Sequence, residues 1–162
     1  MMCSHLMLQA HHSLPLHRIE VCSLHRISVI PSPNYLKVWN SCYFEATTLK
    51  TLGLTIQLGH HGAECPMSVM GPSTFTVIHV NGIHNVNAAF CGCSNSVGIP
   101  CWRQLMHIGW FLSTTSYPET CTMFQALRQC HLLTLHSKLS TFQFYSALSR
   151  LTDNTGLSVP PV

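Results

Sequence analysis

A short apolar segment that ends in two closely spaced cysteines constrains the fold of this chain more than its other sequence features do. Residues 75–93 read FTVIHVNGIHNVNAAFCGC, and a glycine-rich turn with His60 and Cys65, GHHGAEC, precedes them. Cys91 and Cys93 are two positions apart, so on a strand their side chains leave the same face. Two thiolates on one face can share a zinc ion, with Zn–S bonds of about 2.3 Å. Two buried cysteines without a metal would give the same spacing.

The same segment predicts a β-hairpin. β-Branched and aromatic residues are frequent in 75–80 and 84–90, and Asn81-Gly82 lies between them. Both residues of this dipeptide accept positive φ, which makes it a strong signal for a tight hairpin turn. We expect a further short strand near 54–58, where β-branched residues come just before the GHHGAEC turn.

The last third of the chain has a mainly helical pattern. Ser116 with Glu119, and then Ser140 with Gln143, each have the spacing of a capping box and predict the starts of two helices. Before them, LMHIGWFLST at 105–114 predicts another strand. We therefore expect an α+β fold, in which a small antiparallel sheet that carries the zinc cluster is followed by two α-helices.

The amino-acid composition favours some classes of function over others. Only 8% of the 162 residues are charged, whereas 12 are histidine and 9 are cysteine; charged residues make up roughly 25% of a typical domain. The eight lysines and arginines are scattered, and this does not predict a clustered basic face for nucleic acid. No apolar run approaches the ~20 residues that span a bilayer, and no secretory signal is recognisable. In a reducing compartment, clustered cysteine and histidine indicate a metal site before a disulfide.

The metal site that these patterns predict is a zinc site with Cys65, Cys91 and Cys93 as three of its ligands. The fourth is His60, in the glycine-flanked turn, or alternatively His84, which begins the second hairpin strand. Three other cysteines lack ligand spacing and are expected to be packing residues: Cys101, Cys121 and Cys130.

No enzymatic activity is expected. The acidic residues are too dispersed to form the carboxylate cluster of a two-metal nuclease, and they number five: Glu20, Glu45, Glu64, Glu119 and Asp153. No motif indicates a nucleophilic pair or a small-molecule substrate.

Three stretches together resemble one family: YFEATTLKTLGLTIQLGHHGAECP at 43–66, FTVIHVNGIHNVNAAFCGC at 75–93 and HLLTLHSKLSTFQFYSALSRLTDNTGL at 131–157. They are similar to the second CxC-type (CxC2-like) cysteine-cluster domain that accompanies KDZ (Kyakuja–Dileera–Zisupton) transposases, found chiefly in mushroom-forming fungi. The resemblance runs from about Cys3 to Leu157. It implies a zinc-binding cluster upstream of an RNase H-like catalytic domain, a nuclear location, and a role in binding DNA or protein, including that catalytic domain.

The resemblance also divides the chain. Residues 1–20 are similar to a B-box-like Cys/His element, but Leu6 stands where the family has its second cysteine, so we interpret them as a remnant. Residues 21–37 form an irregular insert, 38–157 the CxC-type domain, and 158–162 a tail. The chain ends where the transposase body is expected, which indicates a truncated protein. The alternative to a zinc-binding module is therefore a decayed or wrongly annotated transposon fragment without a selected function.

We expect the segment 21–37 to be a retained intron, although an ordinary loop insertion is the alternative. Val21-Cys22 can be encoded by GTATGT, a fungal splice donor, and the codon of Lys37 can end in the AG of an acceptor. Mature transcripts should then join the codons of Glu20 and Val38 in frame. Transcript sequencing checks this, and full read depth across the segment with no such junction would contradict it.

Overall fold

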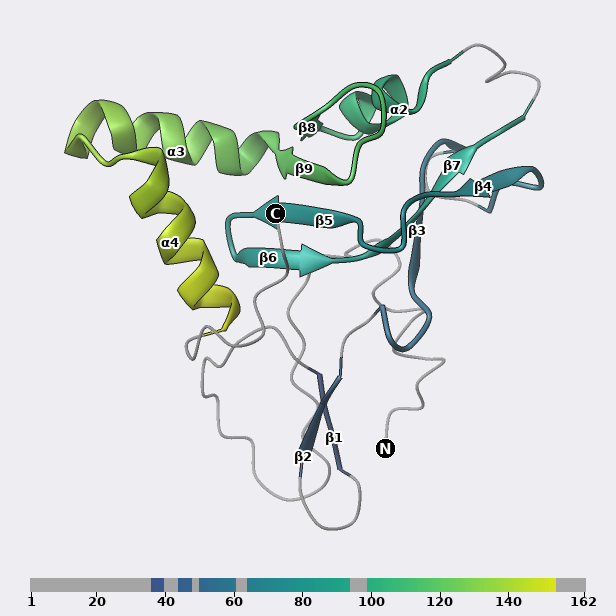
Figure 1. The fold of residues 1–162 in the computed structure, drawn as a ribbon, viewed down its shortest axis with the longest axis horizontal. Helices are drawn as coiled ribbons and strands as arrows, with labels where there is room; N and C mark the ends of the chain where they lie inside the picture. The colour runs from purple at the N-terminus through teal and green to yellow at the C-terminus, as the bar shows by residue number, and fades with distance from the viewer. Residues whose placement is uncertain (1–35, 40–43, 48–49, 61–63, 94–98, 154–162) are drawn as a thin grey trace.

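The protein is described by a computed structural model over residues 36–39, 44–47, 50–60, 64–93 and 99–153 (Figure 1). The expected remnant at 1–20, most of the insert at 21–37 and the tail at 158–162 lie outside these ranges. Within them, three small sheets and three helices form the α+β arrangement that the sequence predicts. The antiparallel hairpin is present, but two of the sheets also contain a parallel pair, so these sheets are mixed.

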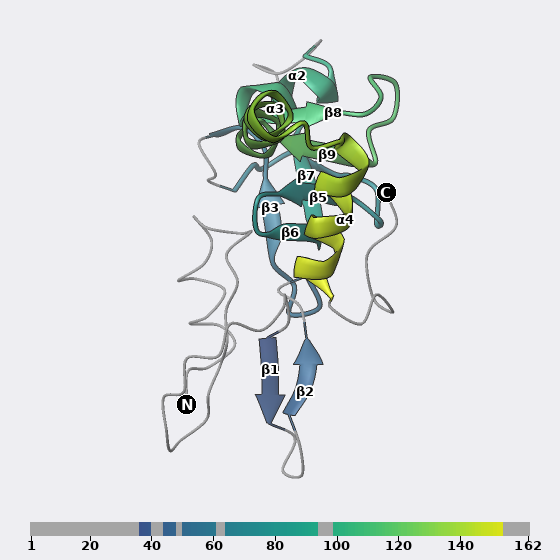
Figure 2. The ribbon, with the colours of Figure 1, turned by 90° about the vertical axis from the view of Figure 1, so that its left-hand side faces the viewer.

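The first sheet is a two-stranded antiparallel ribbon. β1 (Leu36–Trp39) pairs with β2 (Phe44–Thr47), and Leu36 lies opposite Thr47. Figure 2 shows this ribbon at the opposite end of the molecule from the helices α2 and α3. The expected end of the insert, after Lys37, falls inside β1, so the last two residues of that segment are paired in a strand.

The second sheet has the order β3-β7-β4. β3 (Thr55–Gln57), which confirms the strand expected near 54–58, runs parallel to β7 (Asn87–Cys91). On the other side of β7, β4 (Ser68–Met70) runs antiparallel. β7 is therefore the central strand, and it ends at the first cysteine of the FCGC motif.

The third sheet has the order β6-β5-β9-β8. β5 (Thr76–His79) and β6 (Gly82–Asn85) form the predicted hairpin. β9 (Thr120–Met123) runs parallel to β5, and β8 (Trp110–Leu112) is antiparallel to β9.

The hairpin is confirmed, but its turn lies one residue earlier than predicted. His79 pairs with Gly82, so Val80 and Asn81 make the connection, and Gly82 enters the ladder with a φ of +137°. Asn81 is held by its side chain, because its Oδ1 lies 2.8 Å from Nε2 of His84 and 2.5 Å from Nδ1 of His79.

The single second strand predicted at 84–90 is in fact two strands in two different sheets. β6 and β7 are separated by Val86, whose N–H donates to the carbonyl oxygen of Phe75 at 2.9 Å. The chain thus passes directly from the four-stranded sheet to the three-stranded sheet, whose central strand ends at Cys91 (Figure 1).

The helices are α2 (Cys101–His107), α3 (Phe124–Ser137) and α4 (Thr141–Thr152). The capping box of Ser140 and Gln143 is confirmed at the start of α4. None of these helices, within the described residues, is long and apolar enough to cross a membrane.

Two of the predicted boundaries were wrong. The strand expected at 105–114 is half helix, because α2 begins after Pro100, whose φ of −65° suits a helix start, and ends before Gly109, with a φ of +81°. The helix expected from Ser116 begins only at Phe124. Residues 120–123 pair with β5 and β8 instead, and this pairing overrides the local capping signal.

Two hydrophobic clusters hold these elements together. The larger lies among β5, β7, α2, β8 and β9 and includes Phe75 and Trp110, whose rings stack with centroids 6.1 Å apart. Its other buried members are Leu58, Val77, Val86, Ala88, Phe90, Leu105 and Cys121. The smaller cluster attaches α4 to β6 through Ile83, Phe144 and Leu148.

We predict that Thr152→Val will lower the free energy of unfolding by about 1–3 kcal/mol, the cost of a buried unsatisfied polar group. Thr152 is buried at the end of α4, and its Oγ1 accepts from the N–H of Ile83 at 2.6 Å. Valine fills the same space but cannot accept, so this N–H is left unsatisfied. Denaturant unfolding of the metal-loaded protein measures the change. Thr141→Val, an exposed change in the same helix, is the control, and an equal loss in both variants would contradict the prediction.

Candidate metal centre

His60 reaches its place because the backbone turns sharply after β3. Gly59 has a φ of +86° and His60 a φ of +47°, both in the left-handed region. A Cβ on Gly59 would lie 2.9 Å from the Cβ of Cys91, so the close approach of the two segments also requires glycine. A left-handed conformation costs a residue such as histidine roughly 1–2 kcal/mol. The turn therefore bears a local cost and places the imidazole beside the end of β7.

The second close approach is at Gly92, between the two cysteines. Its N–H donates to the carbonyl oxygen of Met67 at 2.9 Å, and a Cβ on it would lie 2.6 Å from that same oxygen. Glycine in the FCGC motif therefore lets the turn that leads into β4 lie against the end of β7. That turn carries Cys65, which is buried.

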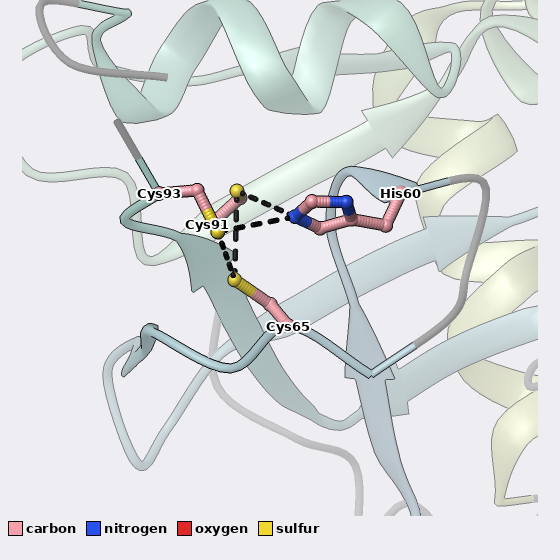
Figure 3. A group of neighbouring side chains, drawn as sticks. All are labelled: His60, Cys65, Cys91 and Cys93. Atoms are coloured by element: carbon pink, nitrogen blue, oxygen red, sulfur yellow. Dashed lines mark hydrogen bonds between the residues drawn. The ribbon is translucent and has the colours of Figure 1, made fainter. Parts of the chain in front are cut away.

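Four side chains converge at this point: His60, Cys65, Cys91 and Cys93 (Figure 3). The Sγ of Cys65 lies 3.5 Å from the Sγ of Cys91 and 3.3 Å from that of Cys93. Nε2 of His60 lies 3.2 Å from the Sγ of Cys91 and 3.4 Å from that of Cys93. All four donor atoms lie within 4.8 Å of one another.

These distances fit a tetrahedral metal site. Zn–S bonds of about 2.3 Å and Zn–N bonds of about 2.0 Å place two sulfurs about 3.8 Å apart, and a sulfur and a nitrogen about 3.5 Å apart. The four separations in this structure, 3.2–3.5 Å, are shorter than these values by about 0.1–0.5 Å. A small outward movement of the side chains would admit an ion, so this group could hold a metal.

The sulfurs affect one another's ionisation. The hydrogen bond with the Cys65 thiol, and then partial burial, raise the pKa of the Cys93 thiol to about 11, and the neighbouring Cys91 adds to the effect. Without a cation the Cys93 thiol therefore keeps its proton at neutral pH. A metal that binds Cys93 as a thiolate has to displace that proton.

His84, the alternative fourth ligand, is not a member of this group. It lies on β6, in the other sheet, and its Nε2 contacts Oδ1 of Asn81 at the hairpin turn. The sequence suggested it because β6 and β7 read as one strand. The break at Val86 separates it from the cysteines.

The three cysteines expected to be packing residues differ. Cys121 is buried in the larger cluster, and burial raises the pKa of its thiol to about 12. Cys130 is half-buried and packs against the smaller cluster. Cys101, at the start of α2, is exposed, so for this residue the expectation was wrong.

No feature of the sequence singles out Gln104. This residue of α2 is buried and hydrogen-bonded to the backbone of Cys91. Its partners are main-chain atoms 13 residues earlier in the chain, outside any local motif, so no spacing could have indicated the contact.

We predict that Cys91→Ser and Cys93→Ser will each abolish stoichiometric metal binding. Either change removes one of the three sulfur donors, and a hydroxyl is a poor ligand for a metal that prefers thiolate. Zinc titration followed by elemental analysis measures the loss. Cys101→Ser, an exposed cysteine outside the group, is the matched control and should bind as the parent protein does. Wild-type stoichiometry in either cluster variant would show that the group is not the site.

Comparison with protein families matches residues 49–156 to the CxC2-like cysteine cluster associated with KDZ transposases. No curated protein and no solved structure matched the chain. The matched range covers about two thirds of the chain and includes all four converging side chains, whereas the resemblance at residues 1–48 lies outside it. The chain therefore belongs to the CxC2-like cysteine-cluster family associated with KDZ transposases.

Proposed function

We propose that this chain is a zinc-binding module of a KDZ transposase, in which the ion stabilises the fold and takes no part in catalysis. The observation that carries this proposal is the set of four protein donors within 4.8 Å of one another. Structural zinc sites have four protein ligands, whereas catalytic zinc sites keep a position open for water or substrate. The geometry therefore favours a structural ion.

The donor types favour zinc. Three thiolates and an imidazole suit a borderline-soft ion with tetrahedral geometry. Magnesium and calcium prefer oxygen ligands, and this group supplies none. The ion would join His60, Cys65 and the pair Cys91 and Cys93, which come from three separate parts of the chain.

The energy available from such an ion is large. A structural zinc site contributes about 10–16 kcal/mol at neutral pH, comparable with the whole stability of a domain, about 5–15 kcal/mol. The sheet that carries the cluster consists of strands of only three to five residues. We therefore expect the folded state of this region to depend on the metal.

The absence of a catalytic role is supported by the placement of the acidic residues. Among the described residues, the only group of three or more potential metal ligands is the one formed by His60 and the three cysteines. A two-metal nuclease needs clustered carboxylates instead. The completeness of the four-residue group, with glycine at both close approaches, also favours a selected module over a decayed fragment.

The partner we propose is a protein surface, with the transposase catalytic domain as the candidate and DNA as the alternative, in the nucleus where a transposase acts. Two of the described cations are engaged within the chain: Lys50 contacts Ser73 and Asn85, and Arg103 lies over the ring of Trp102. The described surface exposes large apolar side chains, among them Phe111, Phe124, Leu127, Leu132 and Leu135. Phosphate recognition relies on clustered basic groups, whereas exposed apolar patches mark protein contacts.

We predict that one equivalent of zinc will be required for folding, and that the zinc-loaded chain will neither cleave DNA nor bind it tightly. Circular dichroism during chelation and zinc re-addition measures the first part. Incubation of labelled duplex DNA with magnesium or manganese tests for cleavage, and fluorescence anisotropy at about 0.15 M salt tests for binding. Calorimetry with the transposase catalytic domain tests the proposed partner.

Each part has its own contrary result. A metal-free chain that is folded and as stable as the zinc-loaded one would overturn the structural role of the ion. Metal-dependent DNA cleavage that disappears when a carboxylate of this chain is mutated would overturn the non-catalytic role. Submicromolar binding to DNA, without binding to the catalytic domain, would make DNA the partner.

A further inference from the structure

The backbone of Cys91 lies where the central strand β7 loses its neighbour on one side. In an extended strand, successive backbone groups point alternately to opposite sides. Toward β4, the carbonyl oxygen of Ala88 accepts from Gly71, and the N–H of Gly92 donates to Met67. Toward β3, the carbonyl oxygen of Ala89 accepts from the N–H of Leu58 at 2.8 Å.

After Leu58 the chain turns away at Gly59, so β3 provides no further partner on that side. The N–H and C=O of Cys91 point to that side, because they alternate with those of Gly92. Cys91 is buried, so these backbone groups need hydrogen-bond partners other than β3.

Gln104 replaces it. Its Oε1 accepts from the N–H of Cys91 at 2.9 Å, and its Nε2 donates to the carbonyl oxygen of Cys91 at 3.0 Å. A primary amide carries an acceptor and donors in one plane, as a peptide group does. Gln104 is only 8% exposed, so water competes little for these two hydrogen bonds. The side chain thus extends the β3 side of the sheet by one residue, from helix α2.

We propose that Gln104 is a positioning residue for the metal site, which fixes the backbone of Cys91 so that its thiolate points at the ion. The inference rests on the proposed zinc function. Cys91 is well placed for such control, because its Sγ contacts both Cys65, at 3.5 Å, and Nε2 of His60, at 3.2 Å. Movement of this backbone would change both distances at once.

The chemistry requires an amide of this length. Methionine has a similar length but can neither accept strongly nor donate. An ionised glutamate can accept from the N–H of Cys91, but it places a negative charge against the carbonyl oxygen and near the thiolates. Asparagine is one methylene shorter, so its amide would not reach both backbone groups.

The experiment compares Gln104→Met and Gln104→Glu with the parent protein and with Thr152→Val. Thr152 also satisfies a buried backbone N–H, but that N–H belongs to Ile83 on β6, away from the cluster. Zinc affinity is measured by competition with a chromophoric chelator, and the ligand-field spectrum of the cobalt-loaded protein reports the geometry of the site. Unfolding free energies of all four zinc-loaded proteins are measured in parallel.

We expect Gln104→Met to lower the zinc affinity by about 10–100-fold, as changes to residues that orient metal ligands do. The cobalt spectrum should change in intensity. Gln104→Glu should also bind less tightly than the parent protein, and it provides the test if Gln104→Met does not fold. Thr152→Val should keep the parent's cobalt spectrum, and its affinity should fall by much less.

Parental affinity and spectrum in a folded Gln104→Met, or in Gln104→Glu where only that variant folds, would overturn the inference. A loss of affinity no larger than that of Thr152→Val, at equal unfolding free energy, would do the same, because it would show only a general structural role. If the parent protein binds no zinc, the proposed function itself fails. If it binds one equivalent and the Gln104 variants bind alike, only the role of Gln104 is wrong.

Discussion

The structure around the end of β7 depends on the electrostatic interaction among three cysteine sulfurs and one imidazole. As neutral groups they form weak hydrogen bonds, and as thiolates without a cation they would repel one another. A divalent ion makes the net electrostatic energy of the thiolates favourable, because the attraction of each thiolate to the ion exceeds its repulsion from the others. The hydrogen bond with Cys65, then burial, and to a smaller extent the neighbouring Cys91 and the repulsion between thiolates, raise the pKa of Cys93. Binding of an ion is therefore also proton release, and the affinity has to fall as the solution becomes more acidic.

The backbone segments that carry the four converging side chains are conformationally strained. Gly59 and His60 both have left-handed φ values, and Gly92 lies too close to Met67 for any side chain. A non-glycine residue with positive φ is uncommon and persists where the surroundings determine it. Here the residue that bears the cost is a proposed ligand. Contacts made by its imidazole with Cys91 and Cys93 offset the cost, and a bound ion would offset it further.

Sequence signals that depend on a few neighbouring residues predicted much of this fold. Contacts between residues distant in the sequence could not be predicted in this way. The hairpin and the capping box of Ser140 and Gln143 depend on neighbours within a few residues, and both are present. The capping signal at Ser116 failed because residues 120–123 join a sheet through β5, about forty positions earlier. Cysteine spacing and a glycine-flanked histidine indicated the residues that converge. The role of Gln104 had no such signal, because a side-chain amide that bonds to a remote backbone leaves no pattern in the sequence.

The direct passage from β6 to β7 links the metal centre to the helices. β6 is held on one side by α4, through Ile83 and the side chain of Thr152. One residue, Val86, separates its end from the strand that carries Cys91. Since Val86 is buried and bonded to Phe75, the two sheets cannot shift independently without breaking the larger cluster. If an ion binds the four side chains at one end of this continuous segment, its removal should therefore loosen β7 first, while α4 and β6 keep their own apolar contacts.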